Sequence, residues 1–123
     1  MSAPGLHVDR ENGVLVVALE GEHDLASRES VRGAIDGALD GGLAVVIDLR
    51  ATGFIDSVVV AVFLEARKKA KQQNLGLGIV LSDSPRNEVR RMFELSELTT
   101  VFRVHPSREA ALQAVRGGFV ETT

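Results

Sequence analysis

The sequence feature that most constrains the fold is a run of branched apolar residues at positions 43–49, which lacks apolar–polar alternation. Such a run is typical of a strand that is covered on both faces of a parallel sheet. A second buried strand is predicted at residues 75–81. The stretch between the two runs is long enough for the helical crossover that parallel neighbours need, so we predict an α/β fold with right-handed crossovers.

The start of the chain carries a hairpin signal. Asn12-Gly13 separates a weak apolar stretch at residues 6–8 from a clear one at residues 14–19. An Asn-Gly pair between two apolar stretches favours a tight antiparallel hairpin. The sheet is therefore expected to be mixed, and residues 21–24 are expected to end its second strand.

Two helices are predicted in the first two thirds of the chain. Residues 27–39 carry apolar side chains three and four apart, and Gly41-Gly42 would stop that helix. The valines within residues 54–64 favour a strand by propensity. We interpret this stretch as helix, because Asp56 and Ser57 offer a helix N-terminus and residues 65–73 are strong helix formers.

The last third of the chain predicts two more helices around a short strand at residues 101–104. Ser84 is the expected N-cap of one helix, with Pro85 at its first position, and Ser107 begins the other. The expected inward-facing residues are Val89, Met92, Phe93, Ala111, Leu112 and Val115. Together the elements predict a mixed, mostly parallel sheet of four to five strands with an N-terminal hairpin and about four helices. We expect one domain over residues 1–123, with a frayed tail at residues 117–123.

Composition excludes several kinds of site. The chain has no cysteine, which rules out disulfides and thiolate chemistry. His7, His23 and His105 lack metal-ligand spacing, so we expect them at the surface or in loops and predict no metal or cofactor.

Charge and hydropathy narrow the choice of partner. The longest apolar run, residues 58–64, is far short of the roughly 20 residues that span a bilayer. The N-terminus carries no secretory signal, and we expect a cytoplasmic protein without membrane attachment. A net charge of −3 and the absence of Trp and Tyr argue against nucleic-acid binding.

The best candidate for regulation is Ser57. Its hydroxyl would lie at the positive end of a helix dipole, near free backbone N–H groups. A phosphate there would add about −1.5 to −2 charges next to Asp56. The alternative is that Ser57 or Asp56 serves only as a helix cap.

Residues 45–49 and 54–57, Val-Val-Ile-Asp-Leu and Phe-Ile-Asp-Ser, resemble the core signature of STAS domains. This family includes the anti-sigma factor antagonists of bacteria. Weaker similarity extends to residues 21–25, 89–93, 98–102 and 110–111, which covers almost the whole chain. The resemblance implies a STAS-like fold and no enzymatic activity.

The same resemblance identifies the site residues. It implies that a partner anti-sigma factor, which is also a serine kinase, phosphorylates Ser57. The implied partner-binding residues are Asp24, Asp56, Ser57, Val58 and Val59. Asp24 also has a simpler interpretation as a cap for the helix that follows it, and the two roles are compatible.

The chain departs from the family pattern directly after Ser57. Family members usually have Ser or Thr followed by Gly-Leu-Gly, where this chain has Val58, Val59, Val60 and Ala61. The change removes a hydroxyl and adds bulk at the start of the helix. Whether Ser57 is phosphorylated, or the chain is a STAS interaction module without that control, is therefore left open.

A response-regulator receiver domain is the main alternative. Asp48 lies at the end of a buried strand, as the acceptor aspartate of a receiver does, and Glu20, Glu22 and Asp24 follow another strand. However, His105 stands where a receiver needs a lysine. An enzyme is less favoured still, because no Gly-x-Ser-x-Gly motif or base accompanies Ser57.

The predicted function is thus partner switching. The unphosphorylated protein would bind the anti-sigma factor and release its sigma factor, phosphorylation of Ser57 would end the binding, and a phosphatase would restore it.

Overall fold

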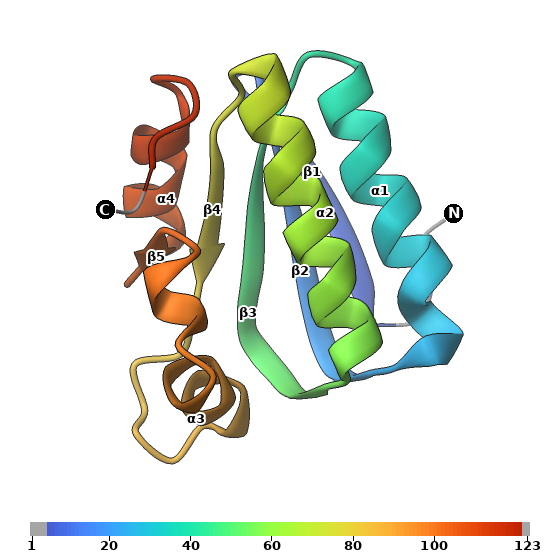
Figure 1. Cartoon of the computed structure of the whole chain (residues 1–123), viewed down its shortest axis with the longest axis vertical. Coiled ribbons are helices and arrows are strands. Elements are labelled where there is room, and N and C mark those ends of the chain that lie inside the picture. The colour runs from blue at the N-terminus through green and yellow to red at the C-terminus, as the bar shows by residue number, and fades with distance from the viewer. Residues whose placement is uncertain (1–4, 122–123) are drawn as a thin grey trace.

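The computed structural model describes residues 5–121, which form a five-stranded sheet with four α-helices (Figure 1). The elements in chain order are β1 (Leu6–Glu11), β2 (Val14–His23), the 3₁₀ turn η1 (Leu25–Ser27), α1 (Arg28–Asp40), β3 (Ala44–Ile55), α2 (Ser57–Gln73), β4 (Leu77–Val80), α3 (Glu88–Leu95), the 3₁₀ turn η2 (Leu98–Thr100), β5 (Val104–His105) and α4 (Arg108–Val115). The strand order is β1-β2-β3-β4-β5. Among the strands of residues 5–121, only β1 and β2 pair antiparallel, so the predicted mixed, mostly parallel sheet is confirmed.

The predicted opening hairpin is confirmed. Asn12 and Gly13 have φ angles of 48° and 81°, and Glu11 pairs directly with Val14. Positive φ at both central residues is the requirement of the tightest hairpin turns, and Asn-Gly meets it at the lowest cost.

β2 and β3 are both longer than the sequence predicts. β2 does not end at Gly21 but continues to His23, and β3 continues past Leu49 to Ile55. The two extensions pair with each other, and two register shifts place an extra residue on β3 each time, the second at Gly53. The hydrogen bonds between the two extensions satisfy their backbone N–H and C=O groups, while most of their polar side chains face solvent. These segments can therefore remain strands although they contain glycine and charged residues.

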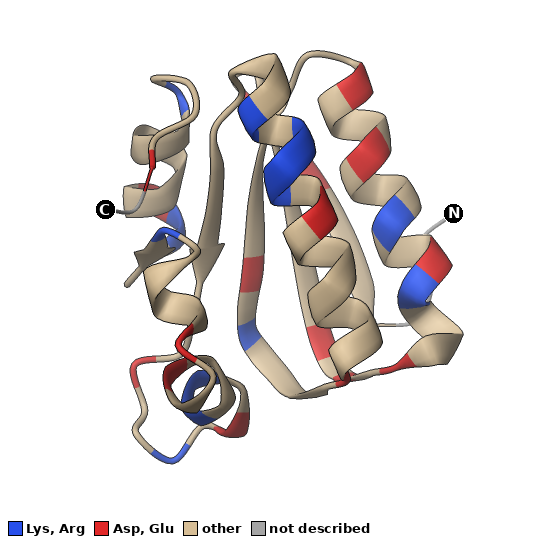
Figure 2. Ribbon diagram, viewed as in Figure 1, with Lys and Arg blue, Asp and Glu red and all other residues tan. Residues whose placement is uncertain are grey.

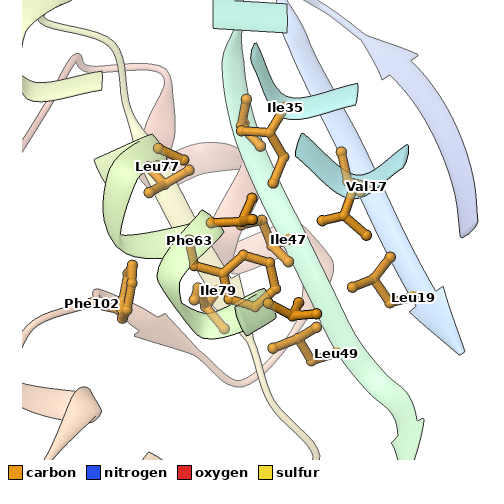
Figure 3. Close-up of a cluster of buried hydrophobic side chains, with 14 of the residues drawn as sticks. Val17, Leu19, Ile35, Ile47, Leu49, Phe63, Leu77, Ile79 and Phe102 are labelled. Carbon is orange, nitrogen blue, oxygen red and sulfur yellow. The ribbon is translucent and has the colours of Figure 1, made fainter. Parts of the chain in front are cut away.

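The two faces of the sheet are covered by different helices. Val45, Ile47 and Leu49 of β3 face a core formed with α1, α2 and α3, and the ring of Phe63 from α2 lies at its centre (Figure 3). Ala44 and Val46 face the opposite side, where α4 packs against the sheet. Coverage on both faces explains the unbroken apolar run of β3.

The helix predictions are largely confirmed, with one correction. α1, α2 and α4 lie within about a residue of their predicted starts, and Ser107 caps α4 by accepting a hydrogen bond from the Ala110 N–H at 3.1 Å. The start of α3 at Ser84 and Pro85 is wrong. Asn87 caps that helix and accepts from the Arg90 N–H at 2.9 Å, while Ser84 belongs to the turn before it.

The end of the chain also differs from the prediction. The last strand is limited to residues 104–105, because the N–H groups of Val101 and Phe102 donate to the Leu98 carbonyl at 3.1 and 2.9 Å and so continue the turn η2 (residues 98–100). Residues 117–121 of the predicted tail turn back along α2: the guanidinium of Arg67 lies over the Phe119 ring and pairs with Glu121 at 2.9 Å. Residues 122 and 123 of the predicted tail lie outside the described residues.

Candidate phosphorylation and partner-binding site

Ser57 is the first residue of α2 and is exposed. Asp56 is the N-cap, and its carboxylate accepts a hydrogen bond from the Val58 N–H at 3.2 Å. The Ser57 hydroxyl donates to the same carboxylate oxygen, Oδ1, at 3.1 Å. Asp56 is therefore a helix cap, as the alternative interpretation predicts, and the accessible Ser57 hydroxyl lies beside it.

The valines after Ser57 do not share one environment. Val59 is completely buried in the core, whereas Val58 is half-buried and Ala61 is exposed. The bulk that replaces the usual first glycine is thus accommodated inside the protein. On the outer face, Ser57 is followed one turn later by the small side chain of Ala61, and Val59 can affect a partner only through the position of α2.

The structure brings Asp24 to the same edge of the sheet as Asp56. The two residues directly follow His23 and Ile55, which are paired neighbours on β2 and β3, and the Asp56 N–H donates to the His23 carbonyl at 3.0 Å. The Asp24 carboxylate is exposed and accepts from the Ala26 N–H at 2.9 Å, so it caps η1 rather than α1 itself. Ser57 and both aspartates therefore form one edge.

His23 supports this edge, and sequence reasoning missed it. The prediction that it lies at the surface is wrong, because its side chain is buried within β2. One ring nitrogen, Nε2, lies 3.1 Å from both the Gly5 and Glu20 carbonyls, so it carries a hydrogen, and Nδ1 lies 3.0 Å from the Ser27 hydroxyl. Gly5 is 18 positions away in sequence, and contacts to residues three before and four after His23 are not part of any strand pattern, so the local sequence could not indicate the burial.

The other two histidines have different surroundings. His7 is exposed, as predicted, whereas His105 is half-buried in β5. Burial, together with the charge of Arg103, lowers the pKa of His105. Within residues 5–121, no three His, Asp or Glu side chains gather in a way that could hold a metal ion.

Exposed apolar side chains lie on the segments that form or adjoin the Ser57 edge. Leu25 is 66% exposed in η1, Phe54 is 50% exposed just before Asp56, and Leu64 is 40% exposed on α2. The first two turns of α2 carry no charged residue, and Figure 2 shows that half of the helix uncharged while its later turns are charged. Sequence reasoning did not single out Leu25 or Phe54, although each lies outside the predicted inward-facing stripes. Exposed apolar residues grouped with polar ones are typical of protein-binding surfaces.

Comparison with known proteins decides the family. The model of the STAS domain family matches residues 6–111. The chain belongs to the STAS domain family. The resemblance carried by residues 45–49 and 54–57 is thereby confirmed.

Relatives of this STAS chain share nearly its full length. It is 34% identical to the anti-sigma-F factor antagonist RsfB of Mycobacterium tuberculosis, over 98% of this chain and 99% of RsfB. The crystal structure of an anti-sigma factor antagonist from Mycobacterium paratuberculosis is 32% identical, with a TM-score of 0.78 over 94% of this chain and 99% of that one. SpoIIAA of Bacillus in its phosphorylated form is 22% identical, with a TM-score of 0.66 over 90% of this chain and 99% of its own, a likeness that shows the fold.

The receiver alternative is wrong for this STAS chain, and the surroundings of Asp48 agree. Asp48 is buried, and its carboxylate accepts hydrogen bonds from Arg50 and Arg108. Burial alone would raise the pKa of Asp48, but the hydrogen bonds and charge of Arg50, with a further bond from Arg108, lower it below the usual value. An aspartate held in this way is a structural ion pair, not an open acceptor.

No helix among the described residues is both long and apolar enough to cross a membrane.

Proposed function

We propose that this STAS chain is an anti-sigma factor antagonist that is controlled at Ser57. It binds an anti-sigma factor that is also a serine kinase, and this binding releases the sigma factor. The observation that carries the proposal is the exposed Ser57 hydroxyl at the start of α2, whose first two turns carry no charge, in a chain 34% identical over its length to an anti-sigma-F factor antagonist.

The proposed docking surface consists of Asp24, Leu25, Phe54, Asp56 and Ser57 with the outer face of the first turns of α2. Leu25 and Phe54 supply exposed apolar area, which a partner would cover. Such side chains commonly supply most of the binding energy when they fill pockets on the partner. The two aspartates would set orientation and restrict the partner to groups that donate hydrogen bonds or carry positive charge.

Phosphorylation would change this surface in two ways. The partner kinase would transfer the γ-phosphoryl group of ATP to Ser57 Oγ; the hydroxyl proton and ADP leave. The hydrogen that Ser57 now donates to Asp56 Oδ1 is then lost, and a dianion stands beside that carboxylate. The dipole of α2 stabilises a phosphate that points outward, into the partner.

The size of the effect is enough for a switch. Like charges brought together at an interface cost several kcal/mol. A loss of about 3 kcal/mol weakens binding more than a hundredfold. A phosphatase that removes the group would restore the original surface.

Val58 and Val59 are expected to affect phosphorylation by the kinase more than binding to it. Val58 provides no hydroxyl near the phosphoacceptor, while Val59 is directed into the core and leaves the docking surface unchanged. The second candidate is therefore a STAS module that binds the same partner but is not phosphorylated. Val58, which stands where the family has Ser or Thr, favours this alternative.

The test is to incubate the protein with each anti-sigma kinase of its source organism and ATP, then locate phosphate by mass spectrometry. The proposal expects a complex without ATP and a single phosphate on Ser57 with ATP. Ser57→Ala should abolish labelling, and Ser30→Ala, which changes an exposed serine on α1, should not. Binding without phosphorylation would leave the second candidate, and failure to bind any such kinase would end both.

A test of the docking surface uses its apolar residues. Leu25→Ser and Phe54→Ser should each weaken the complex, whereas Leu95→Ser, which changes an 80% exposed leucine on α3, should leave it unchanged. Equal weakening by all three variants would contradict the placement of the surface.

A further inference from the structure

A hollow of about 490 Å³ lies on the face of the sheet that bears α4, away from the core packed by α1 and α2. Its floor includes Ala18 and Asp48, which are paired neighbours on β2 and β3. Arg50 and Arg108 line it from β3 and from the first turn of α4, and Glu20 and His7 complete its border. The volume is within the range of small-molecule sites.

The arginines are fixed in place by one buried carboxylate. Arg50 donates from Nε to Asp48 Oδ1 at 3.0 Å and from Nη2 to Oδ2 at 2.8 Å. Arg108 donates from Nη2 to the same Oδ2 at 3.2 Å, and the Arg50 N–H donates to Oδ1 at 3.1 Å. Both oxygens of Asp48 are thus fully engaged. The cluster of Asp48, Arg50 and Arg108 carries two positive charges and one negative charge.

Arg108 has donor capacity that no protein group uses. Its Nε is buried and has no hydrogen-bond partner among the described residues. A buried donor without a partner costs free energy, and an arginine fork matches the two oxygens of a carboxylate or phosphate. Because this Nε is itself covered, an anion in the hollow would meet the exposed parts of the two guanidiniums, whose side chains are 45% and 36% exposed, and the excess positive charge there favours an oxyanion.

The strand itself is distorted at this place. Between Asp48 and Ala51, β3 carries one residue more than β2 has opposite it. Such bulges redirect side chains and are over-represented near functional sites. Here the bulge lies at Leu49 and Arg50, beside the guanidinium that lines the hollow.

We propose that this hollow binds a small oxyanion, a carboxylate or a phosphate group, held between Arg50 and Arg108. Asp48 orients the two guanidiniums and is not itself a ligand. Glu20, which lies 3.4 Å from His7 at the border, limits the charge that the site accepts and favours small anions over polyanions. The site is on a different face from the Ser57 edge and does not depend on the proposed function.

The test is a titration of the ¹⁵N-labelled protein with succinate and, separately, with inorganic phosphate, at constant ionic strength, followed by NMR. The site predicts saturable shifts in the amides of residues 50, 51 and 108–110. Arg50→Gln and Arg108→Gln should each weaken the binding about tenfold, as expected for the loss of a charged hydrogen-bond donor. Arg86→Gln, an exposed arginine outside the hollow, is the matched control and should change nothing.

A further variant separates ligand binding from a structural role. Glu20→Gln removes the negative charge at the border and should strengthen binding severalfold, which loss of packing would not do. Saturation by only one of the two probes identifies the anion class. The proposal is wrong if neither probe saturates, or if the shifts fall elsewhere, or if neither arginine variant changes them. Should Arg108→Gln disturb α4, Arg50→Gln decides alone.

Discussion

Asp48 and Asp56 stand eight positions apart, one within β3 and one directly after it, and the protein uses them in opposite ways. Asp48 is buried and receives hydrogen bonds from two arginines on one face of the sheet. Asp56 is half-buried directly after the carboxyl end of β3, where it caps α2 and accepts a hydrogen bond from the Ser57 hydroxyl. The first environment stabilises the charge of the carboxylate, and the second leaves a neighbouring hydroxyl accessible to modification. The contrast teaches that surroundings, not residue type, separate an aspartate with a structural role from one that stands beside the proposed phosphorylation site.

The largest expected effect is on partner binding, at Ser57 beside Asp56. Ser57→Asp should weaken binding to the anti-sigma kinase more than a hundredfold, because it places a fixed negative charge beside Asp56. Isothermal titration calorimetry would measure the binding, and the thermal unfolding midpoint should change little, since Ser57 is exposed. Ser57→Ala is the matched control and should bind as the original protein does. Equal binding by the two variants would exclude a charge switch.

For Asp48, the comparison predicts a loss of stability instead. Asp48→Asn should reduce the free energy of unfolding by about 1–3 kcal/mol, because two guanidiniums lose their charged acceptor. The loss of stability is small because both arginines are partly exposed to water, which screens their interaction with Asp48. Urea unfolding would measure it, with Asp9→Asn on the exposed face of β1 as the control. Kinase binding should be unaffected; if Asp48→Asn instead abolished binding, the separation of the two aspartates would be wrong.

Removal of the cap tests whether Asp56 has both a structural and a regulatory part. Asp56→Ala should cost about 1 kcal/mol, which is usual for loss of an N-cap. It should also free the Ser57 hydroxyl and remove the charge that would repel a phosphate. We therefore expect phosphorylation to weaken binding less in Asp56→Ala than in the original protein, measured as the ratio of the Kd values of the phosphorylated and unphosphorylated forms. If Asp56 is only a helix cap, Asp56→Ala would lower stability and leave the ratio of the Kd values of the phosphorylated and unphosphorylated forms unchanged.

The smallest effect is on the pH dependence of stability. Because the folded-state pKa of Asp48 is lowered, its contribution is fully present above the ordinary value of 3.8 and is lost as the pH falls through the lowered folded pKa. The original protein should lose stability over that acid range, and Asp48→Asn should show a flatter acid limb. Unfolding by urea at a series of pH values would measure it. Parallel acid limbs would show that another carboxylate controls acid unfolding.

The sequence predicted those features that depend on local pattern. The hairpin at Asn12-Gly13, the buried run at residues 43–49 and the capped start of α2 follow from turn geometry, burial periodicity and capping. Ser57 and Asp56 could be placed because a helix N-terminus has a short sequence signature.

Features that depend on distant partners were missed. The extension of β2 past Gly21 requires the matching extension of β3, and the burial of His23 requires the Gly5 carbonyl. The two arginines on Asp48 come from positions 50 and 108, which no local pattern connects. Ser84 and Asn87 are both good caps, and only packing selects between them.

The most direct test of the central claim measures release of the sigma factor. A labelled sigma factor is bound to its anti-sigma kinase, and this STAS chain is added, first without ATP and then with the chain fully phosphorylated on Ser57. Fluorescence anisotropy would follow the sigma factor. The account predicts that the unphosphorylated chain displaces the sigma factor and that the phosphorylated chain does not. Equal displacement by both forms, or by neither, would contradict it.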